Sequence, residues 1–219
     1  MSSSDRTPRV ERILDAADRL FYQQGIRAVG VDAIAAAAQV SKRTLYNHFH
    51  SKDELIAAYL ARRAQPMPLS DAPPAVQILA VFDRLERGFA TRGFRGCPFV
   101  NAVVELGHAV PVANAMAVDF KEQRRQWYRE LLGRLGVAGA DALASQIVLL
   151  VDGAIAHMLV RGDPKVARSA QDAVRTLLEA AGVQCPRPGA EHGSSRAARG
   201  RRPLDEGAQT PRGRRSSKS

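Results

Sequence analysis

The sequence predicts an all-α protein with a packed core, and three observations carry that prediction. Apolar residues recur at spacings of three and four along most of the chain, as they do on the buried side of a helix. Aromatic residues make up only 5% of the 219 residues and runs of alternating β-branched residues are scarce, which disfavours a sheet. Apolar residues account for 45% of the chain, which is enough for a packed core.

The first two predicted helices are recognised by their ends and by their apolar spacing. Thr7 is a candidate N-cap for a helix that starts at Pro8 and closes at Gly25. A second, shorter helix covers VDAIAAAA, residues 31–38. The apolar side of the first helix consists of Val10, Ile13, Leu14, Ala17, Leu20 and Phe21.

Two serines introduce the next two helices. Ser41 is the expected N-cap of a third helix, which runs from Lys42 to about Phe49. Ser51 is the expected N-cap of a fourth helix, residues 52–64, whose first turn carries two acids where the helix dipole favours them.

A stretch rich in proline, QPMPLSDAPP at residues 65–74, ends the fourth helix and marks a domain boundary. Beyond it, Gly and Pro separate five further helices whose lengths suit an antiparallel bundle: residues 75–90, 97–109, 112–136, 140–162 and 164–182. We therefore expect a head at residues 1–63, a helical bundle at 64–182 and a tail at 183–219 with the composition of a disordered segment.

Most of the net charge of +10 lies in that tail. Residues 183–219 contain nine Lys or Arg and three acids, a net of +6, which leaves +4 for the rest of the chain. The tail could add non-specific affinity for nucleic acid or act only as a solubilising extension, and its composition favours neither.

The sequence shows no signal for secretion, for membrane insertion or for catalysis. The longest apolar run, residues 147–160, contains Asp152 and His157 and is shorter than the roughly 20 residues that a membrane span needs. Cys97 and Cys185 lack metal-ligand spacing and are expected to be reduced thiols. Without a Gly-rich phosphate loop, a metal cluster or a nucleophile elbow, we expect a cytoplasmic protein with no enzyme activity, metal or cofactor.

The third predicted helix and its surroundings, VSKRTLYNHFHSKDEL at residues 40–55, carry an unusual number of hydrogen-bond donors. Leu45 and Phe49 stand four residues apart, as on a buried face, and the other sides are polar. A two-turn helix held to a core on one side suits contact with the major groove on the other. A polar helix face can also be merely solvated, but the preceding short apolar helix and tight turn favour nucleic-acid contact.

These residues resemble the N-terminal DNA-binding domain of the TetR/AcrR family of transcriptional regulators. The resemblance rests on ILDAADRLFYQQG and VDAIAAAAQVSKRTLYNHFHSKDEL and covers residues from about 9 to 60. It implies a three-helix head with a helix-turn-helix, followed by a helical ligand-binding and dimerisation domain, about nine helices in all.

Two residues depart from the family pattern. Gly30 replaces the usual Thr or Ser before the second helix, so a side-chain cap is missing. Gln39 replaces the usual Gly in the turn and is expected to adopt a positive φ at a cost of roughly 1 kcal/mol.

The resemblance and the side-chain chemistry together imply the DNA contacts. Arg43, Thr44 and Asn47 are candidates for base edges, because Arg pairs with guanine and Asn with adenine through bidentate contacts. The basic and aromatic members of the set are expected to hold phosphates, with a half-buried packing role as an equal alternative for His48. The full DNA-binding set is Ser41, Lys42, Arg43, Thr44, Tyr46, Asn47, His48 and Lys52.

A single head of this size reads few base pairs, and regulators of this kind dimerise on a palindromic operator with reading helices roughly 34 to 36 Å apart. The last two helices are the expected interface, since residues 147–160 are apolar nearly all round. A core helix in a monomer is the alternative.

The resemblance also implies that the bundle holds a small-molecule effector. Candidate contacts are Asn101, Glu105, His108, Trp127, Asp152 and His157. Each has a structural alternative: a solvated pair for Glu105 and His108, ordinary core for Trp127, and a hydrogen-bonded interface residue for His157. The scarcity of basic residues in this set argues against a strongly anionic effector. Cys97 could be a thiol sensor or a small buried hydrophobe.

The sequence therefore predicts a ligand-responsive, homodimeric transcriptional repressor that binds a palindromic double-stranded DNA operator and no membrane. An architectural nucleic-acid-binding protein without sequence preference is one alternative, and a helical-bundle enzyme or carrier is another.

Overall fold

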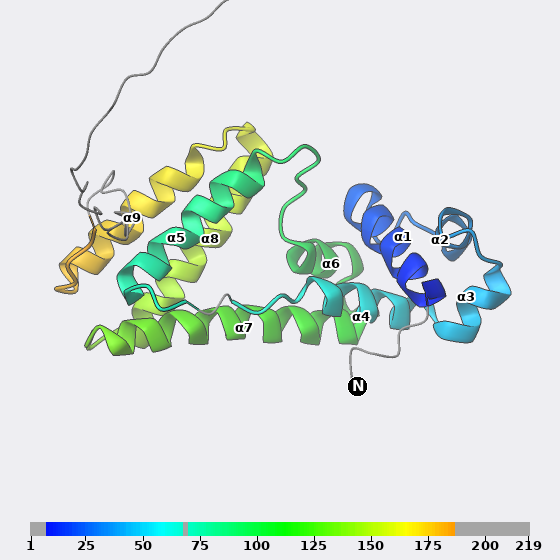
Figure 1. The fold of residues 1–219 in the computed structure, drawn as a ribbon, viewed down its shortest axis with the longest axis horizontal. Helices are drawn as coiled ribbons and strands as arrows, with labels where there is room; N and C mark the ends of the chain where they lie inside the picture. Colours follow the sequence, from blue (N-terminus) through cyan, green and yellow to red (C-terminus); the bar gives the residue numbers. More distant parts are fainter. Residues whose placement is uncertain (1–7, 68–69, 187–219) are drawn as a thin grey trace, which may run out of the picture. The chain divides into compact units, whose positions relative to one another are not determined.

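A computed structural model describes residues 8–67 and 70–186 (Figure 1). Within these residues the chain forms nine α-helices, one short 3-10 helix and no strand, so the expected all-α fold is confirmed. Thr7, the expected cap of the first helix, and the basic tail from Arg187 onward lie outside the described residues.

The first four helices begin and end close to their predicted bounds. They are α1 (Pro8–Gln24), α2 (Val31–Ala37), α3 (Lys42–His48) and α4 (Lys52–Arg63). Their buried apolar residues belong to one cluster, which includes Ile13, Ala17, Phe21, Ile34, Leu45, Phe49, Leu55 and Tyr59.

Both predicted serine caps are present. The Oγ of Ser41 accepts a hydrogen bond from the backbone N–H of Thr44 at 3.0 Å, and the Oγ of Ser51 accepts one from Glu54 N–H at 3.1 Å. Each bond satisfies a backbone donor that the first turn of a helix leaves free, so the caps define where α3 and α4 start. Gly30 precedes α2 without a side-chain cap, as its residue type requires.

The turn between α2 and α3 closes with a non-glycine residue in the left-handed region. Gln39 has φ of +55°, as predicted, and is the only described non-glycine residue with a positive φ. Gln39 N–H donates to Ala36 O at 3.1 Å and Val40 N–H donates to Ala35 O at 3.0 Å. This pair of bonds is a Schellman motif, in which Gly is preferred at the position that Gln39 occupies.

The remaining helices follow the predicted order, and a short 3-10 helix at Gly107–Ala109 separates the second from the third. They are α5 (Pro74–Phe89), α6 (Pro98–Leu106), α7 (Pro111–Arg134), α8 (Ala140–Arg161) and α9 (Val166–Ala180). In Figure 1, α7 runs past α4 and α6 at one end and past α5 and α8 at the other, and it packs against all four.

The buried apolar residues do not divide at the boundary expected between residues 63 and 64. Phe99 and Ala102 of α6, with Ala113 and Ala117 from the first half of α7, share the cluster of the first four helices. A second cluster joins α5, α8 and α9 to the second half of α7. The short α6 and the start of α7 therefore support the N-terminal head rather than the bundle alone.

The first residues of the expected tail contact the bundle. Val183 is buried and Cys185 is partly buried against the second cluster. Arg175 of α9 donates a hydrogen bond to the carbonyl of Pro186. Val183, Cys185 and the Pro186 carbonyl therefore contact the bundle, whereas the rest of the expected tail from Arg187 onward lies outside the described residues.

One described helix, α8, is long and apolar enough by its 22 residues and its composition to cross a membrane. The sequence analysis considered only the apolar run at residues 147–160, which is too short to cross a membrane. The helix that contains this run extends beyond it at both ends and so reaches the required length. Only 22% of its most apolar window is buried, so α8 presents apolar side chains outward as well as inward.

Replacing Gln39 with Gly is expected to raise the free energy of unfolding by about 1 kcal/mol. Glycine has no Cβ and adopts the left-handed conformation without the clash that other residues meet there. Denaturant unfolding followed by circular dichroism measures the change. Gln123→Gly is the matched control: Gln123 is exposed within α7, where glycine is expected to lower stability by about 1 kcal/mol. A Gln39→Gly variant less stable than the parent would contradict strain at this turn.

Candidate functional site

The outer side of α3 presents an arginine and an asparagine to solvent. Leu45 and Phe49 are buried in the head cluster and hold the opposite side of the helix in place. Arg43 and Asn47 are exposed and stand one turn apart, so they lie on the same side of α3. Both side chains can make bidentate contacts with base edges.

Other members of the predicted DNA-binding set have partners inside the head. Lys42 Nζ lies 2.9 Å from the carboxylate of Asp32 on α2, an exposed ion pair that a DNA phosphate can replace. The hydroxyls of Ser41 and Thr44 are 2.8 Å apart, so Thr44 is partly engaged in the cap of the helix. Tyr46 is exposed, and His48 is half-buried.

Lys52 is the member of the set that the structure directs inward. Its Nζ donates a hydrogen bond to the carbonyl of Ile26 at 2.6 Å and lies 5.9 Å from the centre of the Phe21 ring. Burial lowers the pKa of this ammonium group, whereas the nearby carboxylates of Glu105 and Asp53 oppose the shift. Lys52 therefore ties the start of α4 to the segment between α1 and α2.

The end of α4 is joined to α1 by ion pairs. Arg63 donates two hydrogen bonds to the carboxylate of Asp18, at 2.5 and 2.7 Å, and its guanidinium lies 4.6 Å from the centre of the Tyr22 ring. Burial opposes the charged form of Arg63, but its hydrogen bonds to Asp18 and the Asp18 charge outweigh burial and raise its pKa. Arg62 adds a bond of 2.5 Å to Asp15. Planar two-point pairs of this kind are among the stronger ionic contacts in proteins.

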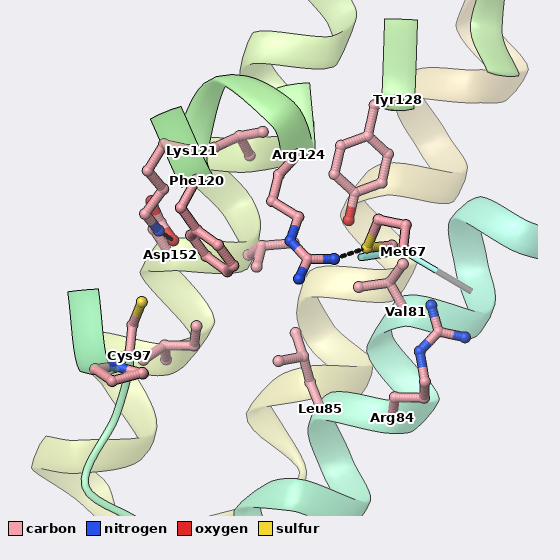
Figure 2. Close-up of a pocket in the computed structure, with 14 residues that line it drawn as sticks. Met67, Val81, Arg84, Leu85, Cys97, Phe120, Lys121, Arg124, Tyr128 and Asp152 are labelled. Atoms are coloured by element: carbon pink, nitrogen blue, oxygen red, sulfur yellow. Dashed lines mark hydrogen bonds and ion pairs between the residues drawn. The ribbon is translucent and has the colours of Figure 1, made fainter. Parts of the chain in front are cut away.

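A cavity of about 310 Å³ lies in the bundle, between α5, the start of α6, α7 and α8 (Figure 2). Its wall is mostly apolar, and the segment after α4 contributes Met67. The residues that line it are Met67, Val81, Arg84, Leu85, Cys97, Pro98, Phe120, Lys121, Arg124, Tyr128, Val148, Val151, Asp152 and Ile155. A mainly apolar wall with a few polar groups is typical of a small-molecule site.

The polar groups of the cavity come chiefly from α7. Lys121 pairs with Asp152 of α8, and Arg124 extends across the cavity toward Met67 (Figure 2). The Tyr128 hydroxyl points into the same space, and burial raises the pKa of this phenol. These groups can orient a polar ligand group inside an apolar space.

Of the six predicted effector contacts, the structure brings Asp152 to this cavity. The cavity does not include Asn101, whose amide donates to Arg95 O at 2.7 Å and so braces the segment before α6. Trp127 is half-buried and packs edge-to-face on Tyr128 at 5.0 Å, outside the cavity lining. His157 is exposed, and the side chain of His108 lies outside the described residues.

Glu105 also faces away from the cavity, for a reason that the sequence did not indicate. Its carboxylate accepts a hydrogen bond from the backbone N–H of Arg27 at 3.0 Å. It lies 3.0 Å from the point where a Cβ of Gly25 would stand, and Gly25 has φ of +93°. Glu105 therefore connects α6 to the segment between α1 and α2, and the expectation of a solvated pair with His108 is incomplete.

Sequence reasoning missed the basic residues of the cavity. Arg84 and Arg124 were not selected because charged residues on a helix usually face solvent. One signal was present: Phe120, Arg124 and Tyr128 recur at intervals of four and so share one side of α7. Cys97 is buried and lines the cavity, a position compatible with either reading of the thiol.

Comparisons with known sequences agree with this arrangement. The family described as "Bacterial regulatory proteins, tetR family" matches residues 13–59, and a "Tetracyclin repressor-like, C-terminal domain" matches residues 111–180. The transcriptional regulator AcuR of Cereibacter sphaeroides is 34% identical over 160 residues, which cover 65% of this chain and 73% of AcuR.

Several other curated relatives match over a shorter length. An HTH-type transcriptional regulator of Mycobacterium tuberculosis, Rv1255c, is 46% identical over 55 residues, 25% of this chain and 27% of the relative. The chain thus spans about a quarter of the length of such relatives.

A solved structure covers nearly the whole described chain. SCO4454, a TetR-family transcriptional regulator from Streptomyces coelicolor, has a TM-score of 0.71 and 36% identity over 79% of this chain and 95% of its own. The similarity therefore includes both the head that carries α3 and the bundle that holds the cavity, and the chain is a DNA-binding transcriptional regulator that belongs to the TetR family.

Proposed function

We propose that the protein is a ligand-responsive repressor that binds a palindromic DNA operator as a homodimer in the cytoplasm. The observation that carries the proposal is the placement of Arg43 and Asn47 on the exposed side of a short helix whose other side is buried. Such a helix can enter the major groove and read bases there. The cavity in the bundle supports the ligand response, since it provides a second, separate site.

The exposed side of α8 supports the homodimer. Its outward residues follow the spacing of four and three that brings two helices together: Ala142, Gln146, Leu149, Gly153, Ala156 and Val160. Leu149 is 70% exposed and Val160 is 85% exposed. A second subunit would cover this stripe, and small residues at Gly153 and Ala156 would let the two helices approach closely.

The outer side of α9 differs from that of α8. Its apolar residues Ala167, Ala170, Val174 and Leu178 are buried toward the second cluster, whereas Arg168, Asp172 and Thr176 are exposed. We therefore place the centre of the interface on α8, with α9 at the polar rim.

Repression is proposed rather than activation on the basis of one relative. DhaR of a Mycobacterium species, named a transcriptional repressor, is 26% identical over 57% of this chain, whereas FasR of Mycolicibacterium smegmatis, 49% identical over 26% of it, is named an activator. The match to DhaR is the longer of the two and extends beyond the head, so we give it more weight than the match to FasR.

Selection of bound duplexes from random DNA tests the proposal directly. The full chain is expected to enrich an inverted repeat, to protect both half-sites in footprinting, and to sediment on that duplex as a dimer. A reporter driven from a promoter that contains the repeat is expected to fall when the protein is present. Enrichment of no preferred sequence would favour the architectural alternative, and a rising reporter signal would overturn repression.

Alanine substitutions on α3 are expected to separate base reading from phosphate contact. Arg43→Ala and Asn47→Ala should each weaken binding to the selected duplex by about 1 to 3 kcal/mol and relax the preference at particular base pairs. Lys42→Ala is the control, because loss of a phosphate contact weakens all duplexes about equally and lowers the salt slope by about 1. Fluorescence anisotropy on the selected duplex and its single-base variants measures both. Uniform weakening by all three variants would remove Arg43 and Asn47 from the base-reading role.

A charged residue on the α8 stripe is expected to separate the subunits. The double variant Leu149→Glu, Val160→Glu should sediment as a monomer and lose most operator affinity, because like charges would face each other across the interface. Both side chains are exposed within one subunit, so the substitutions are not expected to disrupt the fold of the subunit itself. Val112→Glu, on an exposed valine of α7 outside the stripe, is the matched control. A dimer that survives the double variant would place the interface elsewhere.

A further inference from the structure

The cavity contains a half-buried cation, Arg124, with no acidic partner among the described residues. Arg124 Nη2 donates a hydrogen bond to the carbonyl of Gln65 at 2.6 Å, and Nη1 donates to the sulfur of Met67. The guanidinium lies 4.6 Å from the centre of the Phe120 ring. Every one of these partners is neutral, so within the protein the positive charge of Arg124 is stabilised by dipoles and by a ring face rather than by an acid.

The electrostatics of the surroundings disfavour that charge. Burial lowers the pKa of Arg124, Tyr128 and Cys97 oppose that shift, and the positive charge of Arg84 adds to it. Arg84 itself is exposed at the edge of the cavity and forms no ion pair with a described residue. The space in front of Arg124 therefore favours a negative charge.

The other charged residues of the cavity neutralise each other. Lys121 of α7 and Asp152 of α8 form an ion pair on the far side of Phe120 from Met67 (Figure 2). Asp152 is the only carboxylate in the described lining, and it is already engaged. A ligand anion would thus find Arg124 without an acidic partner inside the cavity, Arg84 at its edge, and no unpaired acid to repel it.

The rest of the cavity limits what such a ligand can be. Val81, Leu85, Val148, Val151 and Ile155 form an apolar wall. A volume of about 310 Å³ is at the small end of ligand pockets. The Tyr128 hydroxyl, which forms no hydrogen bond with a described residue, points into the same space and supplies a donor beside the guanidinium.

We propose that the effector is a small, mainly apolar monocarboxylate whose carboxylate is bound by Arg124 and Tyr128 while its apolar part fills the space between α5 and α8. The proposal rests on the ligand response proposed above and names the chemistry of that ligand. A planar guanidinium matches a carboxylate through two parallel hydrogen bonds, which an amide or an alcohol of the same size does not reproduce. The scarcity of basic residues in the sequence-selected set, which argued against an anionic effector, does not apply to this lining.

The same arginine links the carboxylate to the head. Gln65 stands two residues after Arg63, which is clamped to Asp18 of α1. A carboxylate that takes the guanidinium removes a charge-assisted hydrogen bond from the Gln65 carbonyl and so releases the segment that follows α4. Because the ligand and Gln65 compete for one group, binding of the ligand is expected to change the position of α4 and to weaken operator binding.

The experiment compares acids with their neutral isosteres on the full chain. Hexanoate, octanoate and phenylacetate are each paired with the corresponding primary amide, and affinities are measured by calorimetry on the DNA-free protein. The acids are expected to bind at least about tenfold more tightly than the amides, as a charge-assisted hydrogen bond in an apolar site implies. Equal binding of acid and amide, or binding of neither, would overturn the proposal.

Variants assign the preference to the guanidinium. Arg124→Gln should abolish the preference for acids while leaving amide binding within about threefold, and Arg124→Lys should retain part of it, because a lysine keeps the charge but loses the two-point geometry. Arg129→Gln, on an exposed arginine of α7 outside the cavity, is the matched control and should keep the parent's preference. Circular dichroism shows that each variant folds, and a preference that survives in a folded Arg124→Gln would contradict the assignment.

Operator binding distinguishes this inference from the function on which it rests. On the selected duplex, a saturating acid should lower affinity by about fivefold or more, and its amide should not. Failure to select any preferred duplex, with the acid preference intact, would contradict the proposed function alone. A selected duplex together with no difference between acid and amide would contradict the carboxylate proposal alone.

Discussion

The clamp between Arg63 and Asp18 is the interaction on which the rest of the structure depends. It fixes the end of α4 to α1 through two hydrogen bonds and a stacked Tyr22 ring. At the other end of α4, Lys52 holds the Ile26 carbonyl and the Ser51 cap starts the helix. With both ends attached, α4 cannot shift without carrying α1 with it, and α3 follows because Leu45 and Phe49 are buried in the same cluster.

This constraint makes the head a single body, and its polar contacts with the rest of the chain run through α7, through α6 and through the segment before α6. One runs from the cavity: Arg124 of α7 binds the Gln65 carbonyl, directly after α4. Another runs from α6, where Glu105 binds the backbone N–H of Arg27 in the segment between α1 and α2. A third is the bond from Tyr22 of α1 to the Gly96 carbonyl before α6. Each contact joins the head to α6, to the segment before it or to α7, all of which lie next to the cavity, so a change in the cavity wall has short physical routes to α3.

The two sites differ in how the chain builds them. The outer side of α3 is a local feature, since a serine cap, two apolar residues one turn apart and the donors between them all fall within nine residues. The cavity is assembled from residues 67 to 155, and its charged groups come from three helices. Its character depends on which charges find partners: Lys121 has Asp152, and Arg124 has only neutral groups.

The sequence by itself determined the helices, their order, the serine caps and the strained turn at Gln39, because helical periodicity, capping and backbone sterics act over a few neighbouring residues. It also indicated α3 as the donor-rich helix, because the donors and the two buried residues lie within one short stretch of sequence. Only the tertiary structure decided that Glu105 and Lys52 hold the segment after α1 and that α6 packs with the head. It also decided that Arg124 lines the cavity, whereas Asn101 and Trp127 lie outside it. Those outcomes depend on which helices meet, and a side chain on a helix can face a neighbour, a cavity or solvent without any change in its local sequence.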